Sequence, residues 1–333
     1  MLPRNNCTDC DGHRLFDPSR SSTFKPTPGE AVSFGFGTGV DQFPLPTYEG
    51  PNGTIVTDAV DLFGLRSLQQ EWLLCDVDSI LADGVPDGVL GISLVNVSYI
   101  GLYANKSLMP FYWNLYYSNQ LESPKFSFFM NPGHERGGEL TLGGVDELRY
   151  TGSITTVPLN HTESVENYGY FVDQSAIYVD GKMMYNASTG KPYNSALAQL
   201  DTGTAFIYPP DLQTTEALYA AISPDIKPIG TLGSWGASCE VLDSAAVDVT
   251  FQLGSRSEFN ATIPKEFFNL GPFPGQTELC EAVFVAPDFP FTSTDGTLVW
   301  LLGSPLLKSY YTVWDGLNYE VGFATPISIN DEK

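Results

Sequence analysis

Positive charge is scarce in this sequence. Its 333 residues include 16 lysines and arginines against 39 aspartates and glutamates, and the formal net charge at pH 7 is −23. Such a chain repels nucleic acid and anionic membrane surfaces, so we expect no nucleic-acid partner. The acidity has two interpretations. It favours solubility, or it reflects tolerance of an acidic medium in which many carboxylates lose their charge.

Several signatures of cofactor, metal and serine chemistry are also missing. The sequence has no G-x-S-x-G elbow and no glycine-rich phosphate loop that opens a helix. Its three histidines, His13, His134 and His161, are scattered. The spacing Cys7-x-x-Cys10-x-x-His13 hints at zinc, but no second ligand pair lies nearby. We therefore expect no metal and no cofactor, and a local disulfide in preference to zinc at Cys7 and Cys10.

Long apolar segments are absent as well. No run of 18 apolar residues occurs, so no transmembrane helix is expected. Residues 1–6 are polar and lack the apolar core of a signal peptide.

Asn-X-Ser/Thr sequons, in contrast, are more frequent than the content of Asn, Ser and Thr would give by chance. Glycosylated asparagines belong to surface loops of secreted proteins. The set therefore predicts the secretory pathway, with an extracellular or vacuolar destination, and a signal peptide that this sequence has lost upstream. The seven sequons begin at Asn6, Asn52, Asn96, Asn105, Asn160, Asn186 and Asn260.

Glycine (32) and proline (24) are plentiful and spread along the chain, which is typical of many short strands joined by turns. The length suffices for two lobes. We predict an all-β, bilobal fold with lobes at 1–154 and 155–328 and a tail at 329–333. The expected helices cover 107–121 and 211–221. The expected strands include 55–65, 125–130, 139–143, 154–159, 169–179, 195–200, 247–253, 259–263 and 282–287, followed by a last block at 298–303 and 310–315. Residues 31–38 are expected to form a hairpin, and 87–92 a turn that leads into a short buried strand.

The tetrapeptide Asp201-Thr202-Gly203-Thr204 follows one of these expected strands. Alone, Asp-Thr-Gly is a common turn sequence, in which Asp accepts backbone N–H bonds. Here the Thr204 hydroxyl can also bond the carboxylate, and Leu301-Leu302-Gly303 follows further along the chain. This combination favours a catalytic carboxylate at Asp201.

A faint internal repeat relates the two halves. Val89-Leu90-Gly91 matches Leu301-Leu302-Gly303, and Asp201 precedes Gly303 by 102 residues. The same distance counted back from Gly91 ends about ten residues ahead of Met1. The repeat therefore predicts that a partner of Asp201 would lie outside this sequence.

Together with Asp201, these motifs resemble the pepsin-like aspartic proteases, secreted and of fungal type, over nearly the whole chain. The segment 16–24 resembles F-x-P-x-x-S-S-T-[FY], and Phe36-Gly37-Thr38-Gly39 resembles the flap tip Y-G-T-G. Segments 86–91, 138–146, 302–303 and 311–315 resemble F-D-G-I-L-G, G-x-L-x-x-G-G-x-D, L-G and Y-x-V-[FY]-D.

The resemblance implies an endopeptidase active at acidic pH, without a cofactor and monomeric. Two carboxylates about 3 Å apart share one proton and activate a water. Asp201 matches one of them, supported by Thr202, Gly203 and Thr204. The flap residues Phe36, Gly37 and Thr38 would cover an extended peptide substrate. Cys239 and Cys280 would form the second-lobe disulfide.

Three departures from the family pattern matter. Asp-Thr-Gly occurs once, and residues 1–3 resemble the family segment that begins eight or nine residues after the first catalytic Asp. The N-terminal lobe is therefore expected to be incomplete and the chain inactive as written. Phe36 replaces the usual flap tyrosine, and Ala205 replaces a common serine. The alternative is a pseudoprotease that binds peptides or partner proteins. Cys75 is either a buried thiol or the partner of a cysteine in the missing segment.

Overall fold

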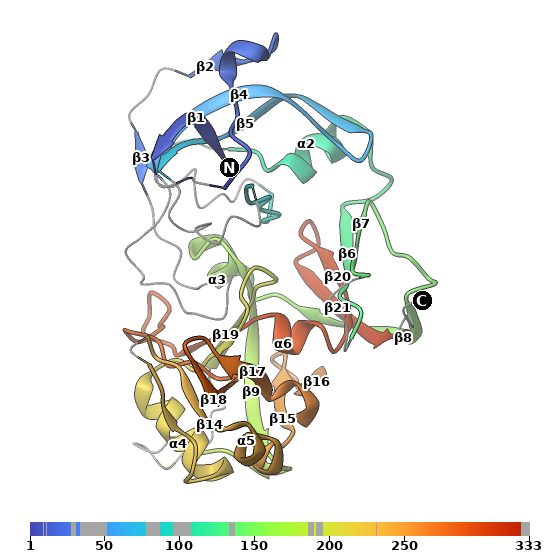
Figure 1. The fold of residues 1–333 in the computed structure, drawn as a ribbon. Coiled ribbons are helices and arrows are strands. Elements are labelled where there is room, and N and C mark those ends of the chain that lie inside the picture. Colours follow the sequence, from blue (N-terminus) through green and yellow to red (C-terminus); the bar gives the residue numbers. More distant parts are fainter. Residues whose placement is uncertain are drawn as a thin grey trace. The chain divides into compact units, whose positions relative to one another are not determined.

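Strands dominate the computed structural model, which describes residues 1–8, 10, 12–27, 31–33, 52–77, 87–95, 108–132, 137–185, 190, 196–230 and 232–327. The chain separates into two compact units. One takes in the described residues up to Pro124 and the other those from Lys125 onward. Figure 1 shows the elements of both. The predicted all-β, two-lobed fold is confirmed.

The first unit is built on one sheet with the strand order β1-β5-β4-β2, in which β3 also pairs with β4. Its long hairpin, β4 with β5, turns at Phe63 and Gly64, whose φ angles are 53° and 81°. A two-residue hairpin turn in which both central residues have positive φ has a backbone twist that matches the twist of the two strands it joins. The elements are β1 (Leu2–Thr8), η1 (Pro18–Arg20), β2 (Lys25–Pro26), β3 (Val32–Ser33), β4 (Asn52–Leu62), β5 (Leu65–Val77) and α2 (Phe111–Tyr117).

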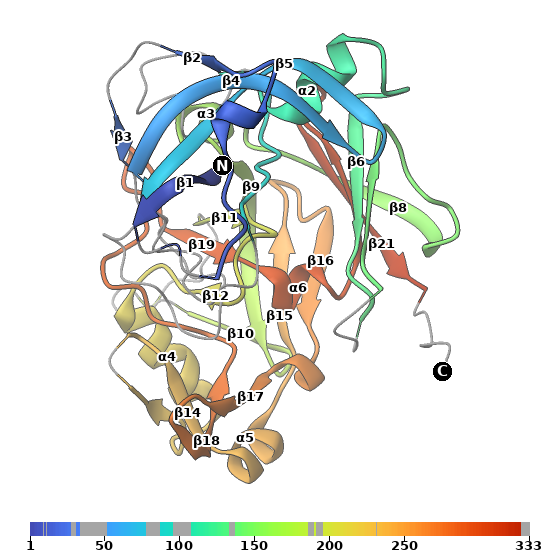
Figure 2. The ribbon, with the colours of Figure 1, turned by 45° about the horizontal axis from the view of Figure 1, so that its top comes forward.

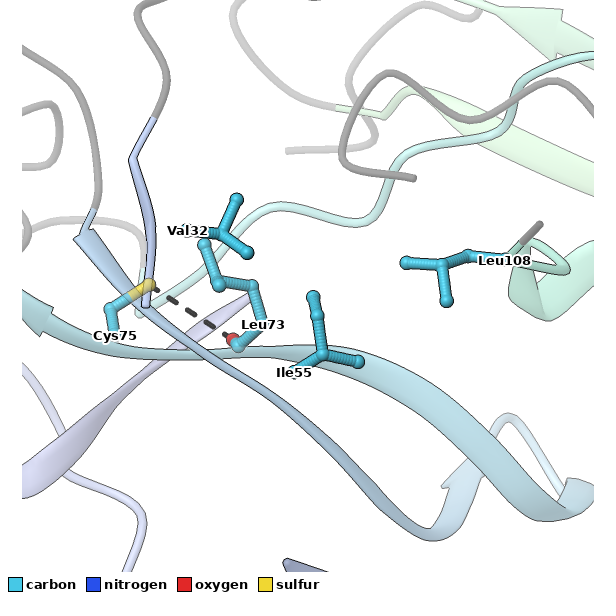
Figure 3. Close-up of a cluster of buried hydrophobic side chains, with 5 residues drawn as sticks. All are labelled: Val32, Ile55, Leu73, Cys75 and Leu108. Atoms are coloured by element: carbon cyan, nitrogen blue, oxygen red, sulfur yellow. Dashed lines mark hydrogen bonds between the residues drawn. The ribbon is translucent and has the colours of Figure 1, made fainter. Parts of the chain in front are cut away.

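The core of this unit includes a cluster of five buried side chains contributed by β3, β4, β5 and the segment before α2 (Figure 3). They are Val32, Ile55, Leu73, Cys75 and Leu108. Cys75 is fully buried, and its Sγ donates a hydrogen bond to Leu73 O at 4.0 Å. Both alternatives for Cys75, a buried thiol or the partner of a cysteine outside this sequence, remain predictions.

The segment that resembles F-x-P-x-x-S-S-T is fixed to β4 through one buried carboxylate. Asp58 is 3% exposed and accepts hydrogen bonds from Ser21 Oγ at 2.9 Å, Thr23 Oγ1 at 2.5 Å and Ala59 N at 2.7 Å. Hydrogen bonds to a carboxylate are strong, because the acceptor is charged. The Ser-Ser-Thr part of the motif thus has a structural role: its hydroxyls attach this segment to β4.

The second unit contains three sheets, seen from another direction in Figure 2. A seven-stranded sheet has the order β12-β19-β11-β9-β15-β16, with β10 also paired to β9. A four-stranded sheet has the order β13-β14-β18-β17, and a five-stranded sheet the order β7-β6-β20-β21-β8. The strands are β6 (Lys125–Phe129), β7 (Glu139–Leu142), β8 (Tyr150–Pro158), β9 (Tyr170–Val179), β10 (Lys182–Met183), β11 (Ala196–Leu200), β12 (Ile207–Tyr208), β13 (Lys227–Pro228), β14 (Trp235–Ser238), β15 (Val249–Leu253), β16 (Phe259–Ile263), β17 (Asn269–Phe273), β18 (Gln276–Ala282), β19 (Val299–Leu302), β20 (Tyr311–Asp315) and β21 (Glu320–Pro326).

Helices of the second unit are short. None of the described helices is long and apolar enough to cross a membrane. They are α3 (His161–Glu166), α4 (Leu212–Ile222), α5 (Cys239–Ala245), η3 (Lys265–Phe267) and α6 (Ser304–Leu307).

The division between the units falls 30 residues before the predicted lobe boundary at 154/155. The reason is the five-stranded sheet, in which β6 pairs with β20 and β8 with β21, so that residues 125–158 group with the C-terminal strands. The lobe boundaries at 154/155 and 328/329 remain a prediction.

Two of the strand predictions are wrong. Residues 87–92 contain no strand, and Leu90 is exposed. The strand expected at 282–287 is β18, which ends at Ala282; the apolar residues that follow are buried in an extended loop. A short apolar run reports burial but does not by itself define a strand.

Two disulfides lie among the described residues: the second-lobe bond that the family resemblance implied, and a local bond of the kind favoured at Cys7 and Cys10, whose partners the sequence left open. Cys239 pairs with Cys280 and joins the start of α5 to β18, while Cys7 pairs with Cys10 at the end of β1.

Candidate active site

Strand β11 carries the chain to Asp201. It lies between β9, to which it is antiparallel, and β19, to which it is parallel. Four of its five residues are buried, and these four are apolar; the exception is Gln199, which is half-buried. At its end, Asp201 N donates to Leu302 O at 3.1 Å, so the ladder with β19 continues up to the aspartate itself.

The carboxylate of Asp201 is oriented by two neighbours in the same turn. Oδ1 accepts a hydrogen bond from Gly203 N at 2.8 Å, and Oδ2 accepts one from Thr204 Oγ1 at 2.7 Å. Asp201 and Thr202 are half-buried, Gly203 is exposed and Thr204 is 1% exposed. Each oxygen therefore has one donor from the protein, while the turn remains open to solvent at Gly203.

Gly303 closes the turn from the other side. A Cβ at this position would lie 2.3 Å from both Thr204 O and Phe206 O, distances that no real side chain tolerates. Ser304 N also donates to Thr204 O at 2.7 Å. The apolar-apolar-Gly pattern was visible in the sequence, but the contact that requires glycine there depends on the fold.

The internal repeat is visible in the register of the strands. In the second unit, Tyr208 pairs antiparallel with Leu301. In the first unit, Met1 N donates to Val89 O at 2.9 Å and Val89 N donates to Met1 O at 3.3 Å, which is also an antiparallel pair. Val89 corresponds to Leu301 in the repeat, so Met1 corresponds to Tyr208.

Several of the predicted site residues lie outside the part of the chain that the structure describes. The flap residues Phe36, Gly37 and Thr38, together with His134, lie outside the described residues, as do the sequons at Asn96, Asn105 and Asn186. Within the described residues, no group of three or more His, Cys, Asp or Glu is placed to hold a metal ion.

The four described sequons differ in accessibility. Asn6 and Asn260 are exposed, whereas Asn52 and Asn160 are half-buried. Asn160 caps α3: its Oδ1 accepts from Glu163 N at 3.2 Å, and its Nδ2 donates to Asp173 Oδ1 at 2.9 Å. Both ends of this amide are already used within the fold.

Comparison with known proteins gives a match over almost the whole chain. The family model described as eukaryotic aspartyl protease matches residues 2–326. The chain is 28% identical to Pepsin-2B of Gadus morhua over 317 residues, which cover 95% of this chain and 84% of that protein. It is 29% identical to Pepsin A of Sus scrofa over 321 residues, covering 95% and 71%. It is 28% identical to Vacuolar protease A of Aspergillus fumigatus over 334 residues, covering 97% and 72%.

Proposed function

The chain belongs to the eukaryotic aspartyl protease family, and we propose that Asp201 is one of the two carboxylates with which such an endopeptidase hydrolyses peptide bonds at acidic pH. The observation that carries the proposal is the turn at Asp201. Its carboxylate is held by Gly203 N and Thr204 Oγ1, and its backbone is bonded to β19.

The chemistry requires a second carboxylate close to Asp201. Two carboxylates about 3 Å apart do not both ionise, so together they hold one proton. The ionised member takes a proton from water, which attacks the scissile carbonyl carbon, while the protonated member donates to the carbonyl oxygen. The two titrate as a unit, which places the optimum in acid.

The position of this partner follows from the register of the repeat. Met1 corresponds to Tyr208, and Asp201 lies seven residues before Tyr208. The counterpart of Asp201 would therefore lie seven residues ahead of Met1. The 333 residues contain Asp-Thr-Gly once, and we expect that these residues alone supply one member of the pair and do not cleave peptides.

The substrate we propose is a peptide in extended conformation, bound beneath the flap with apolar side chains beside the scissile bond. Destinations consistent with the sequons are extracellular or vacuolar, and the exposed Asn6 and Asn260 are the described positions best placed for glycans. Protein expressed in a eukaryotic secretory system should lose mass on treatment with an N-glycosidase. An unchanged mass contradicts this part of the proposal.

The test of the function is an assay of the purified 333-residue chain on acid-denatured globin at pH 3–4, with and without pepstatin. We expect no pepstatin-sensitive cleavage. Cleavage that pepstatin stops would show that a second carboxylate is already present, and would refute the half-pair. A pseudoprotease would instead bind extended peptides with an affinity that Asp201→Asn leaves unchanged.

A further inference from the structure

Glu281 differs from the other buried carboxylates among the described residues. Three acidic residues are 3% exposed or less: Asp58, Asp315 and Glu281. Asp58 accepts from two hydroxyls and a backbone amide, and Asp315 accepts from Asn318 and pairs with Lys125 at 3.3 Å. Neither carboxyl oxygen of Glu281, which is 2% exposed, has a hydrogen-bond partner among the described residues.

The fold makes room for this side chain, but the hydroxyl that acts on it, that of Ser234, does not reach it in full hydrogen-bond geometry. Glu281 lies on β18, between Gly236 of β14 and Gly271 of β17, so neither cross-strand neighbour has a side chain. The preceding residue, Cys280, is tied to α5 by the disulfide, which fixes the strand in place. Glu281 therefore has little freedom to turn its carboxyl toward water.

The charged groups on the surrounding elements do not compensate. Tyr219 of α4 is buried, and its hydroxyl is already bonded to the backbone of Phe284. The remaining titratable groups on the packed elements are exposed: Glu216 on α4, Lys227 on β13, Glu240 and Asp243 on α5, Lys265 and Glu266 on η3, and Glu278 on β18. The two cations among them, Lys227 and Lys265, are both exposed to solvent.

Burial without a partner penalises the charged form of a carboxyl group. Desolvation accordingly raises the pKa of Glu281 to about 7, although the hydroxyl of Ser234 acts in the opposite direction. At the acidic pH proposed for the family chemistry, Glu281 is neutral and its burial is tolerated.

We infer that Glu281 is a pH-sensitive element of the second unit, which keeps the four-stranded sheet of β13, β14, β18 and β17 intact in acid and loosens it when the carboxyl ionises toward neutrality. This property is independent of the catalytic pair. It would confine the fully stable fold to acidic surroundings.

The sign follows from the direction of the shift. The pKa of Glu281 is higher in the folded chain than in an unfolded one, so the folded state binds the proton more tightly. The stability from this group is fully present below pH ~4.5 and is lost as the pH rises to about 7. Over that interval the equilibrium constant for folding of the sheet falls by up to roughly 300-fold, tenfold for each unit of pKa shift.

Hydrogen exchange of the full 333-residue chain, followed by mass spectrometry from pH 4 to pH 8, tests this inference. Protection of peptides covering β14 and β18, corrected for the intrinsic exchange rate, is compared with that of β15 and β16 in the same unit. We expect the ratio to fall with rising pH in the wild type. Glu281→Gln should abolish the fall, because the amide has the same shape and cannot ionise.

The matched control is Glu278→Gln, an exposed glutamate on the same strand, which should follow the wild-type curve. A Glu281→Gln curve that coincides with the wild type, or a wild-type ratio independent of pH, overturns the inference. If Glu281→Gln fails to fold, isotope-edited infrared titration of glutamate carboxyls in the wild type decides. A protonated carboxyl that persists above pH 6 supports the inference, and its absence refutes it.

Discussion

Gly303 is the residue on which the geometry of Asp201 most directly depends. Its missing side chain allows Thr204 O and Phe206 O to approach, and Thr204 in turn donates to the Asp201 carboxylate. Gly303→Ala should therefore destabilise the second unit by about 3 kcal/mol, the upper range for overpacking a tight contact. Chemical denaturation of the purified variant measures the change.

The repeat provides the control for this substitution. Gly91 corresponds to Gly303, yet a Cβ there would meet no described atom within 4 Å. Gly91→Ala should alter the free energy of unfolding by less than about 0.5 kcal/mol. Equal effects of the two substitutions would contradict the role given to Gly303.

At this scale, sequence reasoning succeeds where the chemistry is local. Thr204 is three residues from Asp201, so its hydrogen bond to the carboxylate was predictable from spacing alone. The hydrogen bond to Leu302 O and the burial of Glu281 were not predictable in this way, because they depend on which strand lies beside each residue in the sheet. Register between distant segments leaves only a weak signal in one sequence.

Secondary structure shows the same limit. Strand β9 was predicted nearly to its ends, because its apolar residues mark it as buried. Strand β1 was missed, because residues 1–6 are polar and what makes the segment a strand is parallel pairing with β5 some 70 residues away. Strand β18 begins in exposed residues, so the prediction at 282–287 fell on the buried loop that follows it.

The two disulfides give a prediction for these elements. The Cys239–Cys280 bond closes 41 residues, whereas Cys7–Cys10 closes three. If the bonds act by restricting the unfolded chain, replacing both Cys239 and Cys280 with serine should cost about 4 kcal/mol of stability. The Cys7 and Cys10 double replacement should cost about 1.5 kcal/mol. Denaturant titration of both variants tests the order, and a larger loss from the short loop would contradict it.

The whole molecule combines a net charge of −23 with membership of the eukaryotic aspartyl protease family, for which we propose chemistry in acid. Lowering the pH discharges carboxylates and reduces their mutual repulsion. The all-β class, the two-lobed organisation and the family were all accessible from composition and motifs. The division of the chain was less so, because the sheet that joins β6, β7 and β8 to β20 and β21 links strands more than 150 residues apart.

The central claim is that Asp201 is half of a catalytic pair whose other half belongs seven residues ahead of Met1. The most direct measurement is pepstatin-sensitive cleavage of globin at pH 3.5 by the chain extended with residues 196–207 of its own sequence, which places a second Asp-Thr-Gly at that distance. We predict cleavage by this extended chain, and none when either aspartate is replaced by asparagine or when one residue is inserted before Met1. Equal cleavage with and without Asp201, or no effect of the inserted residue, would contradict the claim.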